Sequence, residues 1–257
     1  MLYEDIEKAF PPSNWGCCWG TWQAAILDYI EQANVHYKLL GKLTYSSGPN
    51  LRSVSVLRLE IATCPSDEPR VFPAHGVDRI SLPMAKHNMV VNYGNTGLTP
   101  VQSGKDYRYV ETMPDGSVYT GAPFTPYDGV PLSHITDGLS KTMMLSETIQ
   151  GNGEDTRGLT WWGDGAGFST YLSPNTNEPD RIFRIFACKP EEPNPPCAQI
   201  SADFPSMYAA RSRHPGVVNA AMCDGSVHTI SDSIDLFVWR AMGSTEGAEI
   251  IDEGFKN

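Results

Sequence analysis

The chain has 257 residues, a formal net charge of −11, and 23 glycines with 20 prolines. An acidic surface repels phosphate backbones, so nucleic-acid binding is disfavoured, and no apolar run approaches the roughly 18 residues that cross a bilayer. The glycine and proline content favours an α+β fold with many turns and long loops over a helical bundle. We expect one domain over residues 1–257.

The first half of the chain carries three predicted elements. Apolar residues recur at helical spacing from Thr21 to Ala33, which predicts an amphipathic helix with Thr21 as its N-cap. Residues 54–61 alternate between apolar and polar and predict a strand. Residues 89–97 predict a second strand that runs into a glycine turn.

The middle of the chain is dominated by turns. Residues 112–120 contain Asp-Gly between short runs and predict a hairpin, with Pro114 at its entry. Residues 134–148 predict a turn followed by a strand of roughly six residues. Residues 151–180 contain Trp161-Trp162 and several glycines, and we expect loops there.

Near the C-terminus, residues 211–231 place His214 ten positions before Asp224. Mostly apolar runs flank Asp224-Gly225, which predicts a hairpin with a two-residue type I′ turn. Asp232 or Ser233 is the predicted cap of a short helix that Gly243 ends.

The spacing of His214, Asp224 and Gly225 resembles the C-terminal motif of the prepilin-type-processing-associated H-x(9)-D-G family, a bacterial pseudopilin-like group of unknown function. Further blocks resemble the same family in the same order, so the resemblance covers nearly the whole chain. They include Phe-Pro-Pro at 10–12, the tryptophan-rich 15–22, Cys-Pro-Ser-Asp at 64–67, 92–97, 135–142, 157–162 and the ending at 239–251.

The resemblance implies an α+β pseudopilin-like head, in which an antiparallel sheet with hairpins and long loops packs with a few helices. Residues 1–9 then look like the remnant of an N-terminal helix whose membrane-embedded half is missing. The sequence has either been shortened to a soluble head or lost its anchor. Membrane contact is expected only through that missing helix.

The same resemblance implies a non-enzymatic subunit of a type II secretion or type IV pilus-like system. Its partners would be other pilin-like or secretion-system subunits, and its location the periplasm, the cell envelope or the outside of the cell. The alternative is a soluble extracytoplasmic binding protein for a small molecule or a glycan.

Of the six cysteines, Cys188 and Cys197 bracket a proline-stiffened loop of the kind that a short disulfide closes. We predict that they are bonded, the alternative being two buried thiols. The pairing of Cys17, Cys18, Cys64 and Cys223 stays open.

We interpret His214, Asp224 and Gly225 as mainly structural. A histidine at a strand entrance can fix the hairpin by hydrogen bonds, although a ligand or partner contact is the alternative. Asp and Gly are the residues that tight turns prefer.

We expect no cofactor, with one possible exception. Loop carboxylates suit a structural calcium ion, for which Asp155, Asp164 and Asp180 are the candidate ligands. The chain lacks the spacing of an EF-hand.

Trp161 and Trp162 are the candidate contact surface, with core packing as the alternative. The sequence contains no G-x-S-x-G, H-E-x-x-H or P-loop motif. A hydrolase built from a convergent His-Asp-Ser cluster remains a distant third interpretation.

Overall fold

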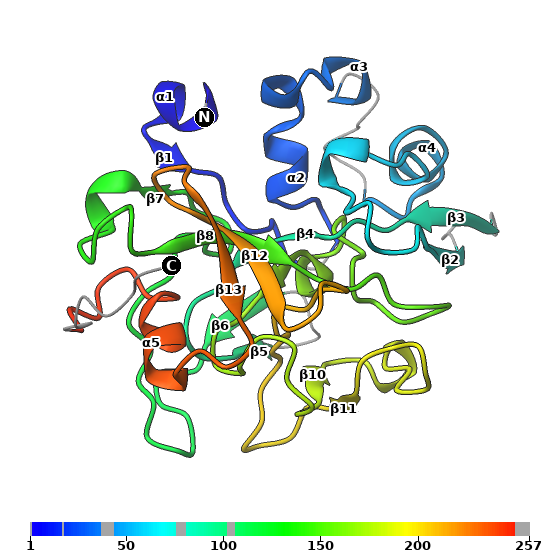
Figure 1. Ribbon diagram of the computed structural model, residues 1–257. Helices are drawn as coiled ribbons and strands as arrows, with labels where there is room; N and C mark the ends of the chain where they lie inside the picture. The colour runs from blue at the N-terminus through cyan, green and yellow to red at the C-terminus, as the bar shows by residue number, and fades with distance from the viewer. Residues whose placement is uncertain (1, 17, 37–43, 76–80, 102–105, 250–257) are drawn as a thin grey trace.

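A five-stranded sheet forms the centre of the molecule (Figure 1). The computed structural model describes residues 2–16, 18–36, 44–75, 81–101 and 106–249. The strand order is β13-β12-β8-β4-β9, and all neighbours are antiparallel except β4 and β9. The strands are β4 (Met89–Asn92), β8 (Met143–Glu147), β9 (Gly167–Phe168), β12 (Val217–Met222) and β13 (Val227–Ser231).

Smaller elements surround this sheet, so the predicted α+β class is confirmed. Four two-stranded sheets are described. Three are antiparallel: β1 (Ala9–Phe10) with β7 (Val130–Pro131), β2 (Val71–His75) with β3 (Ser81–Ala85), and β5 (Leu98–Val101) with β6 (Asp106–Tyr109). The fourth pairs β10 (Asp180–Ile182) with β11 (Cys197–Gln199) in parallel. The α-helices are α1 (Leu2–Glu7), α2 (Trp22–Ala25), α3 (Ala33–His36), α4 (Gly48–Asn50) and α5 (Leu236–Ala241). Single helical turns are η1 (Leu27–Ile30), η2 (Leu51–Ser55), η3 (Glu60–Ala62), η4 (Leu132–His134), η5 (Gly163–Ala166) and η6 (Ile185–Ala187).

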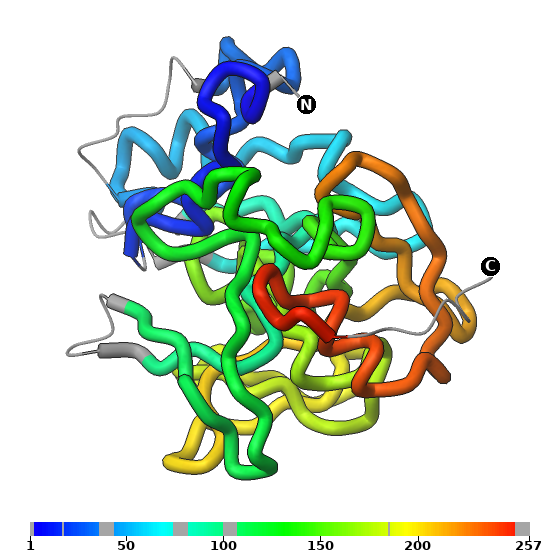
Figure 2. The backbone as a smooth tube through the Cα atoms, turned by 90° about the vertical axis from the view of Figure 1, so that its left-hand side faces the viewer, coloured from blue at the N-terminus to red at the C-terminus, as the bar shows by residue number. Residues whose placement is uncertain are grey.

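The two faces of the sheet bury separate hydrophobic clusters, because side chains alternate along a strand. Val90 and Val218 pack on one face against Trp239 of α5. Val91, the next residue of β4, packs on the other face with Phe10 and Trp22 from the N-terminal segment. Figure 2 shows the two segments that pack on the sheet at different places, the N-terminal segment at the top and α5 in front.

The C-terminal hairpin is confirmed, but its predicted turn is wrong. The Met222 amide donates to the Ser226 carbonyl at 2.8 Å, and the Gly225 amide donates to the Met222 carbonyl at 2.9 Å, so three residues form the loop. Gly225 alone among them has a positive φ, of 85°. A type I turn followed by a left-handed glycine thus replaces the type I′ turn, since type I′ needs a positive φ at both central residues.

The predicted strand at 54–61 is also wrong, because the segment contains the end of η2, an irregular stretch at 57–59 and the start of η3. Leu51, Val54 and Ser55 of η2 are buried at the spacing of a helix, whereas Leu59 is buried in an extended conformation. The expected burial on alternate positions fails at Val56, which is partly buried, and at Ile61, which is exposed.

Other predicted elements differ in detail. The helix expected at 21–33 is divided into α2, η1 and the start of α3, and the Thr21 hydroxyl donates to the Thr160 carbonyl instead of capping. The predicted hairpin at 112–120 contains a single bridge between Thr112 and Val118. Asp235, two or three residues beyond the expected cap, accepts the first amides of α5.

Candidate functional site

His214 lies on the loop that enters β12, and its ring reaches two other side chains. Nε2 of His214 lies 3.6 Å from Sγ of Cys64 and 3.3 Å from Oε1 of Glu147. Its backbone amide donates to the Ser212 hydroxyl at 3.1 Å. The histidine therefore does more than fix the hairpin, which was its predicted role.

Glu147 and Cys64 come from elements far apart in the sequence. Glu147 is the last residue of β8, and its Oε2 accepts the backbone amide of Asn219 on the neighbouring β12 at 2.8 Å. Cys64 follows η3, and its amide donates to Oδ1 of Asn88 at 2.9 Å. Pairing of β8 with β12 thus places the carboxylate where the His214 loop begins.

Cys64 lies against a hydrogen-bonded layer of buried polar side chains. Nδ2 of Asn88 donates to Oδ2 of Asp67 at 2.7 Å, and Nε2 of Gln150 donates to Oδ1 of Asn88 at 2.7 Å. Arg213 pairs with Oδ1 of Asp67 at 3.3 Å, which links this layer to the His214 loop. Side chains held on several sides in this way keep their positions without a ligand.

The three side chains form a cluster with converging ligand atoms. One nitrogen, one sulfur and one carboxylate oxygen lie within 4.8 Å of one another, and no other such group of three occurs among the residues described. Burial, and next to it the Glu147 carboxylate, raises the pKa of the Cys64 thiol. Both close contacts fall on the same imidazole nitrogen, whereas a nucleophile–histidine–acid relay uses one ring nitrogen for each partner.

A groove of about 330 Å³ adjoins this cluster. Its walls are the His214 loop and the proline-rich loop 192–196, and Arg213 joins them by donating to the Pro193 carbonyl at 3.1 Å. The lining residues are Ile149, Asn175, Glu192 to Pro196, Arg211 to His214 and Asp232.

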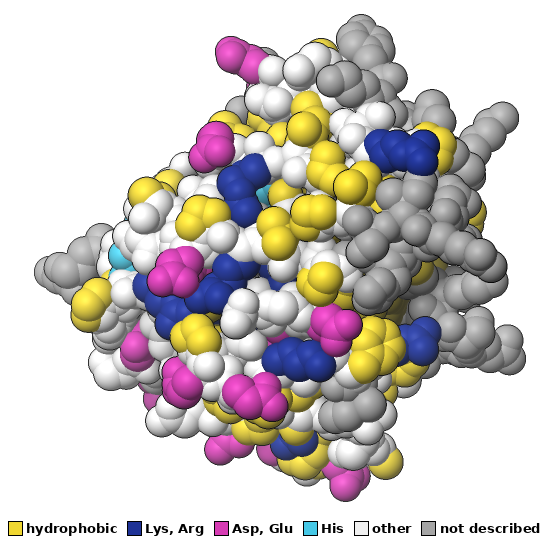
Figure 3. Space-filling model, turned by 90° about the vertical axis from the view of Figure 1, so that its right-hand side faces the viewer, with side chains coloured by type: hydrophobic (Ala, Val, Ile, Leu, Met, Phe, Trp, Pro, Cys, Tyr) yellow, Lys and Arg dark blue, Asp and Glu magenta, His cyan; other side chains and the backbone are white. Residues whose placement is uncertain are grey.

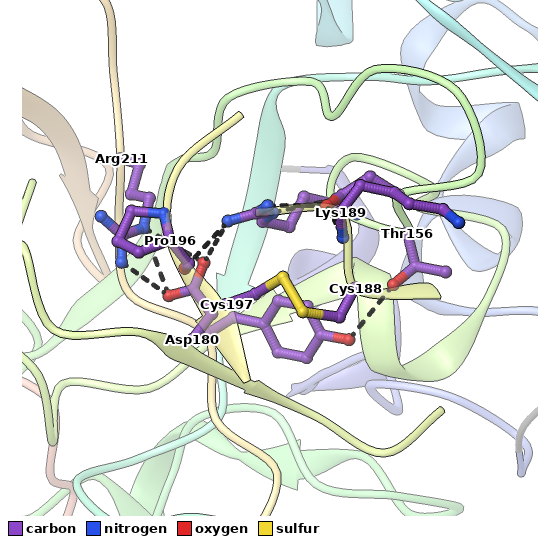
Figure 4. The surroundings of a disulfide bond; sticks show 10 residues. Thr156, Asp180, Cys188, Lys189, Pro196, Cys197 and Arg211 are labelled. Atoms are coloured by element: carbon purple, nitrogen blue, oxygen red, sulfur yellow. Dashed lines mark hydrogen bonds and ion pairs between the residues drawn. A yellow bond between two sulfur atoms is a disulfide. The ribbon is translucent and has the colours of Figure 1, made fainter. Parts of the chain in front are cut away.

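Two of the predicted calcium ligands lie in a buried ion-pair network instead of a shared site. Arg157 pairs with Asp155 at 2.6 Å and with Asp180 at 3.1 Å, and Arg211 pairs with Asp180 at 2.9 Å. Figure 4 shows Arg211 reaching Asp180 beside the disulfide. Guanidinium groups thus hold the positions next to these carboxylates that a cation would take.

Asp164, the third predicted ligand, lies in another part of the core. Neither of its carboxyl oxygens has a hydrogen-bond partner within the described part of the chain. Burial raises the pKa of this carboxyl from its usual 3.8 to about 7. The structure therefore does not bring the three aspartates together, and calcium binding stays a prediction.

The predicted disulfide between Cys188 and Cys197 is confirmed. It joins η6 to β11 at the edge of the ion-pair network (Figure 4). Cys64 and Cys223 are free and buried, and Cys17 lies outside the described residues.

The prediction of Trp161 and Trp162 as an exposed contact surface is wrong. Their exposed fractions are 1% and 8%. Trp161 packs with Leu27 and Val54, and Trp162 packs with Leu51, so both rings fill the space beneath the N-terminal helical segments. A tryptophan ring removes a large apolar area from water when it is buried, which favours the core over an exposed loop position.

Comparison with known families identifies the chain. A family model described as a protein of unknown function, DUF1559, matches residues 1–236. The chain belongs to this family. No curated protein and no solved structure matches it.

One observation bears on where a DUF1559 chain of this kind works. The Cys188–Cys197 disulfide hints at an extracytoplasmic location, because such bonds persist in oxidising compartments. Within the described residues, we find no helix with the length and apolar character that crossing a membrane requires.

Sequence reasoning missed two of the three clustered residues in this DUF1559 chain. The sequence presents Cys64 as a possible disulfide partner in a family block and Glu147 as one residue of the predicted turn and strand at 134–148. The available signals were the position of Cys64 in Cys-Pro-Ser-Asp and a carboxylate that closes an otherwise apolar strand. Neither signal gives the contact with His214, which is 150 residues from Cys64.

Proposed function

We propose that this chain is the extracytoplasmic head domain of a pseudopilin-like protein and that it works through protein–protein contacts. The observation that carries the proposal is the exposed apolar turn at the start of α5. Phe237 is 59% exposed and Leu236 is 38% exposed, while Trp239 on the same helix is fully buried. The helix is therefore fixed in the core at one face and presents large apolar groups at the other.

The location of this turn supports a role in assembly. Asp235 caps the helix with its side chain, so Leu236 and Phe237 stand on a rigid element. Adjacent exposed apolar side chains on such an element are typical of contact sites between proteins. The disulfide and the resemblance of the H-x(9)-D-G motif to prepilin-type proteins point to the same setting.

Figure 3 shows the side of the molecule away from α5, and no one sign of charge dominates it. Basic and acidic side chains alternate on this face, and apolar groups lie between them. The proposed partners are other pilin-like or secretion-system subunits.

Site-specific photo-crosslinking in the native host tests this proposal. A benzophenone amino acid at position 237 should form adducts with a pilin-like or secretion-system subunit. The same probe at Val227, which is 71% exposed on β13, is the matched control. The proposal would be contradicted if the probe at position 237 formed no adduct with such a subunit, or if the probes at both positions formed equal amounts of adduct.

The groove beside His214 favours a second candidate, an extracytoplasmic binding protein. Its volume of about 330 Å³ falls in the range of small-molecule sites. Trp161 and Trp162 are buried and so do not offer a stacking surface for a sugar, and this candidate depends on the groove alone. Amide chemical-shift changes around His214 on adding a glycan library, with none around Phe237, would favour it over assembly.

A further inference from the structure

We propose that Cys64, Glu147 and His214 form a zinc site whose fourth coordination position faces the groove. Each residue supplies one ligand atom, and the three atoms lie within 4.8 Å of one another. Zn²⁺ in proteins is bound by thiolate sulfur, imidazole nitrogen and carboxylate oxygen, which are the three donors present here. Harder cations such as Ca²⁺ and Mg²⁺ take oxygen ligands and do not suit a thiolate.

The distances fit a tetrahedral zinc centre. Zinc bonds of about 2.3 Å to sulfur and about 2.0–2.2 Å to nitrogen and oxygen imply ligand separations of about 3.6 Å for N···S and about 3.4 Å for N···O. The observed separations are 3.6 Å from His214 Nε2 to Cys64 Sγ and 3.3 Å from His214 Nε2 to Glu147 Oε1. The two separations from the imidazole nitrogen therefore match zinc bond lengths, and the third, between the sulfur and the carboxylate oxygen, is no more than 4.8 Å.

Hydrogen bonds within the cluster converge on the carboxylate. The ring N–H of His214 and the thiol of Cys64 can each donate to Glu147, and the sulfur and the ring nitrogen, 3.6 Å apart, are then not bonded to each other. A single electrophile placed between the three atoms satisfies all of them at once. With a thiolate, a carboxylate and a neutral imidazole as ligands, the charge of Zn²⁺ is balanced.

The surrounding residues hold each ligand in place. Asn219 fixes the second oxygen of Glu147, and Asn88 fixes the backbone of Cys64. Groups of this kind orient metal ligands and raise affinity.

The site would be open on one side. The side chain of His214 is 28% exposed and lines the groove, whereas that of Glu147 is only 4% exposed. Three protein ligands with an accessible fourth position are the arrangement of zinc sites that bind water or an incoming ligand. The fourth ligand would thus be water or a donor atom of a molecule in the groove.

Zinc binding by the whole, untagged protein with its disulfide intact tests the proposal. We expect one Zn²⁺ per chain by isothermal titration with ZnCl₂. Cys64→Ser, Glu147→Gln and His214→Gln should each weaken binding about 10-fold to 100-fold or more, in line with the loss of other ligand or supporting residues. Cys223→Ser, which removes the other free buried thiol, should leave the affinity unchanged.

Cobalt substitution in the unmodified protein avoids any dependence on how the variants fold. Co²⁺ bound to a thiolate gives a charge-transfer band in the near ultraviolet, and tetrahedral Co²⁺ gives intense visible bands. We expect both in the wild type and in Cys223→Ser, and loss of the ultraviolet band in Cys64→Ser. A wild-type protein that binds neither Zn²⁺ nor Co²⁺ stoichiometrically, or that binds them without the thiolate band, would overturn the proposal.

Discussion

The His214 loop contributes to two clusters of polar side chains, through Arg211 to one and through His214 to the other. The two clusters differ in how completely the charges of their carboxylates are neutralised. In the cluster around Arg157, two arginines form ion pairs with two aspartates. The backbone amides of Lys189 and Ala209 donate further hydrogen bonds to the same carboxylates. In the cluster around His214, three potential metal ligands face one another with no fixed cation among them.

The difference separates a structural network from a binding site. Buried charges are stable only when they are paired, and a network whose charges are all paired has no unpaired group left to bind a ligand. Aspartates in loops suggested calcium, but the chain supplies its own cations to Asp155 and Asp180. The cluster with unused donor capacity is the one that borders the groove.

The largest effect should follow from breaking the closed network. Arg157→Met keeps most of the side-chain volume but removes the ion pair of Asp155 and one of the two ion pairs of Asp180 that the described residues form. We expect the free energy of unfolding, measured with urea, to fall by about 3–5 kcal/mol. The control is Arg213→Met, whose partly exposed pair with Asp67 should contribute about 1 kcal/mol or less. Equal losses for both variants would contradict the distinction.

Asp164 forms no ion pair with another described residue, and its effect on stability depends on pH. Its pKa is raised to about 7 in the folded protein, so the folded state keeps a proton that the unfolded chain loses near pH 4. The stabilisation is therefore fully present below about pH 4 and is lost as the pH rises through about 7.

The comparison with Asp164→Asn isolates this group. Between pH 4 and pH 8, the wild type should lose about 2–4 kcal/mol of unfolding free energy relative to the variant. A difference that stays constant over this range would show that the carboxyl titrates normally.

The disulfide at the edge of the closed network should contribute somewhat less. Cys188→Ser together with Cys197→Ser removes a bridge over nine positions, and the loop-entropy estimate is about 2–3 kcal/mol. Chemical denaturation of the double variant and of the oxidised wild type measures the loss. A double variant that unfolds at the same urea concentration as the wild type would argue against this contribution.

The smallest effect on stability should come from the open cluster. In metal-free protein, His214→Gln should change the free energy of unfolding by about 1 kcal/mol or less, because the ring is partly exposed and Glu147 keeps its amide partner. Thermal melts with and without ZnCl₂ check this: added zinc should raise the melting temperature of the wild type and not that of the variant.

The elements that the sequence predicted correctly depend on local signals. β4, β8 and the β12–β13 hairpin follow from short apolar runs bounded by turn residues, and the disulfide follows from its proline-rich loop. The strand prediction at 54–61 failed because a short apolar-polar pattern also fits two separate helical turns with an irregular stretch between them, which is what this segment forms.

The candidate site depends on contacts that no local signal contains. His214 was found through its motif, but Cys64 and Glu147 reach it only after β8 pairs with β12 and the segment after η3 folds onto them. The tryptophan pair failed for a related reason, since glycine neighbours indicate a loop without telling whether the loop is covered.

X-ray absorption at the zinc edge tests the central claim most directly. The zinc-loaded wild type should show one sulfur at about 2.3 Å and nitrogen or oxygen neighbours at about 2.0–2.2 Å around each ion. The sulfur should disappear in Cys64→Ser and remain in Cys223→Ser. A shell of oxygen and nitrogen alone in the wild type would contradict the account, because zinc would then be bound away from Cys64.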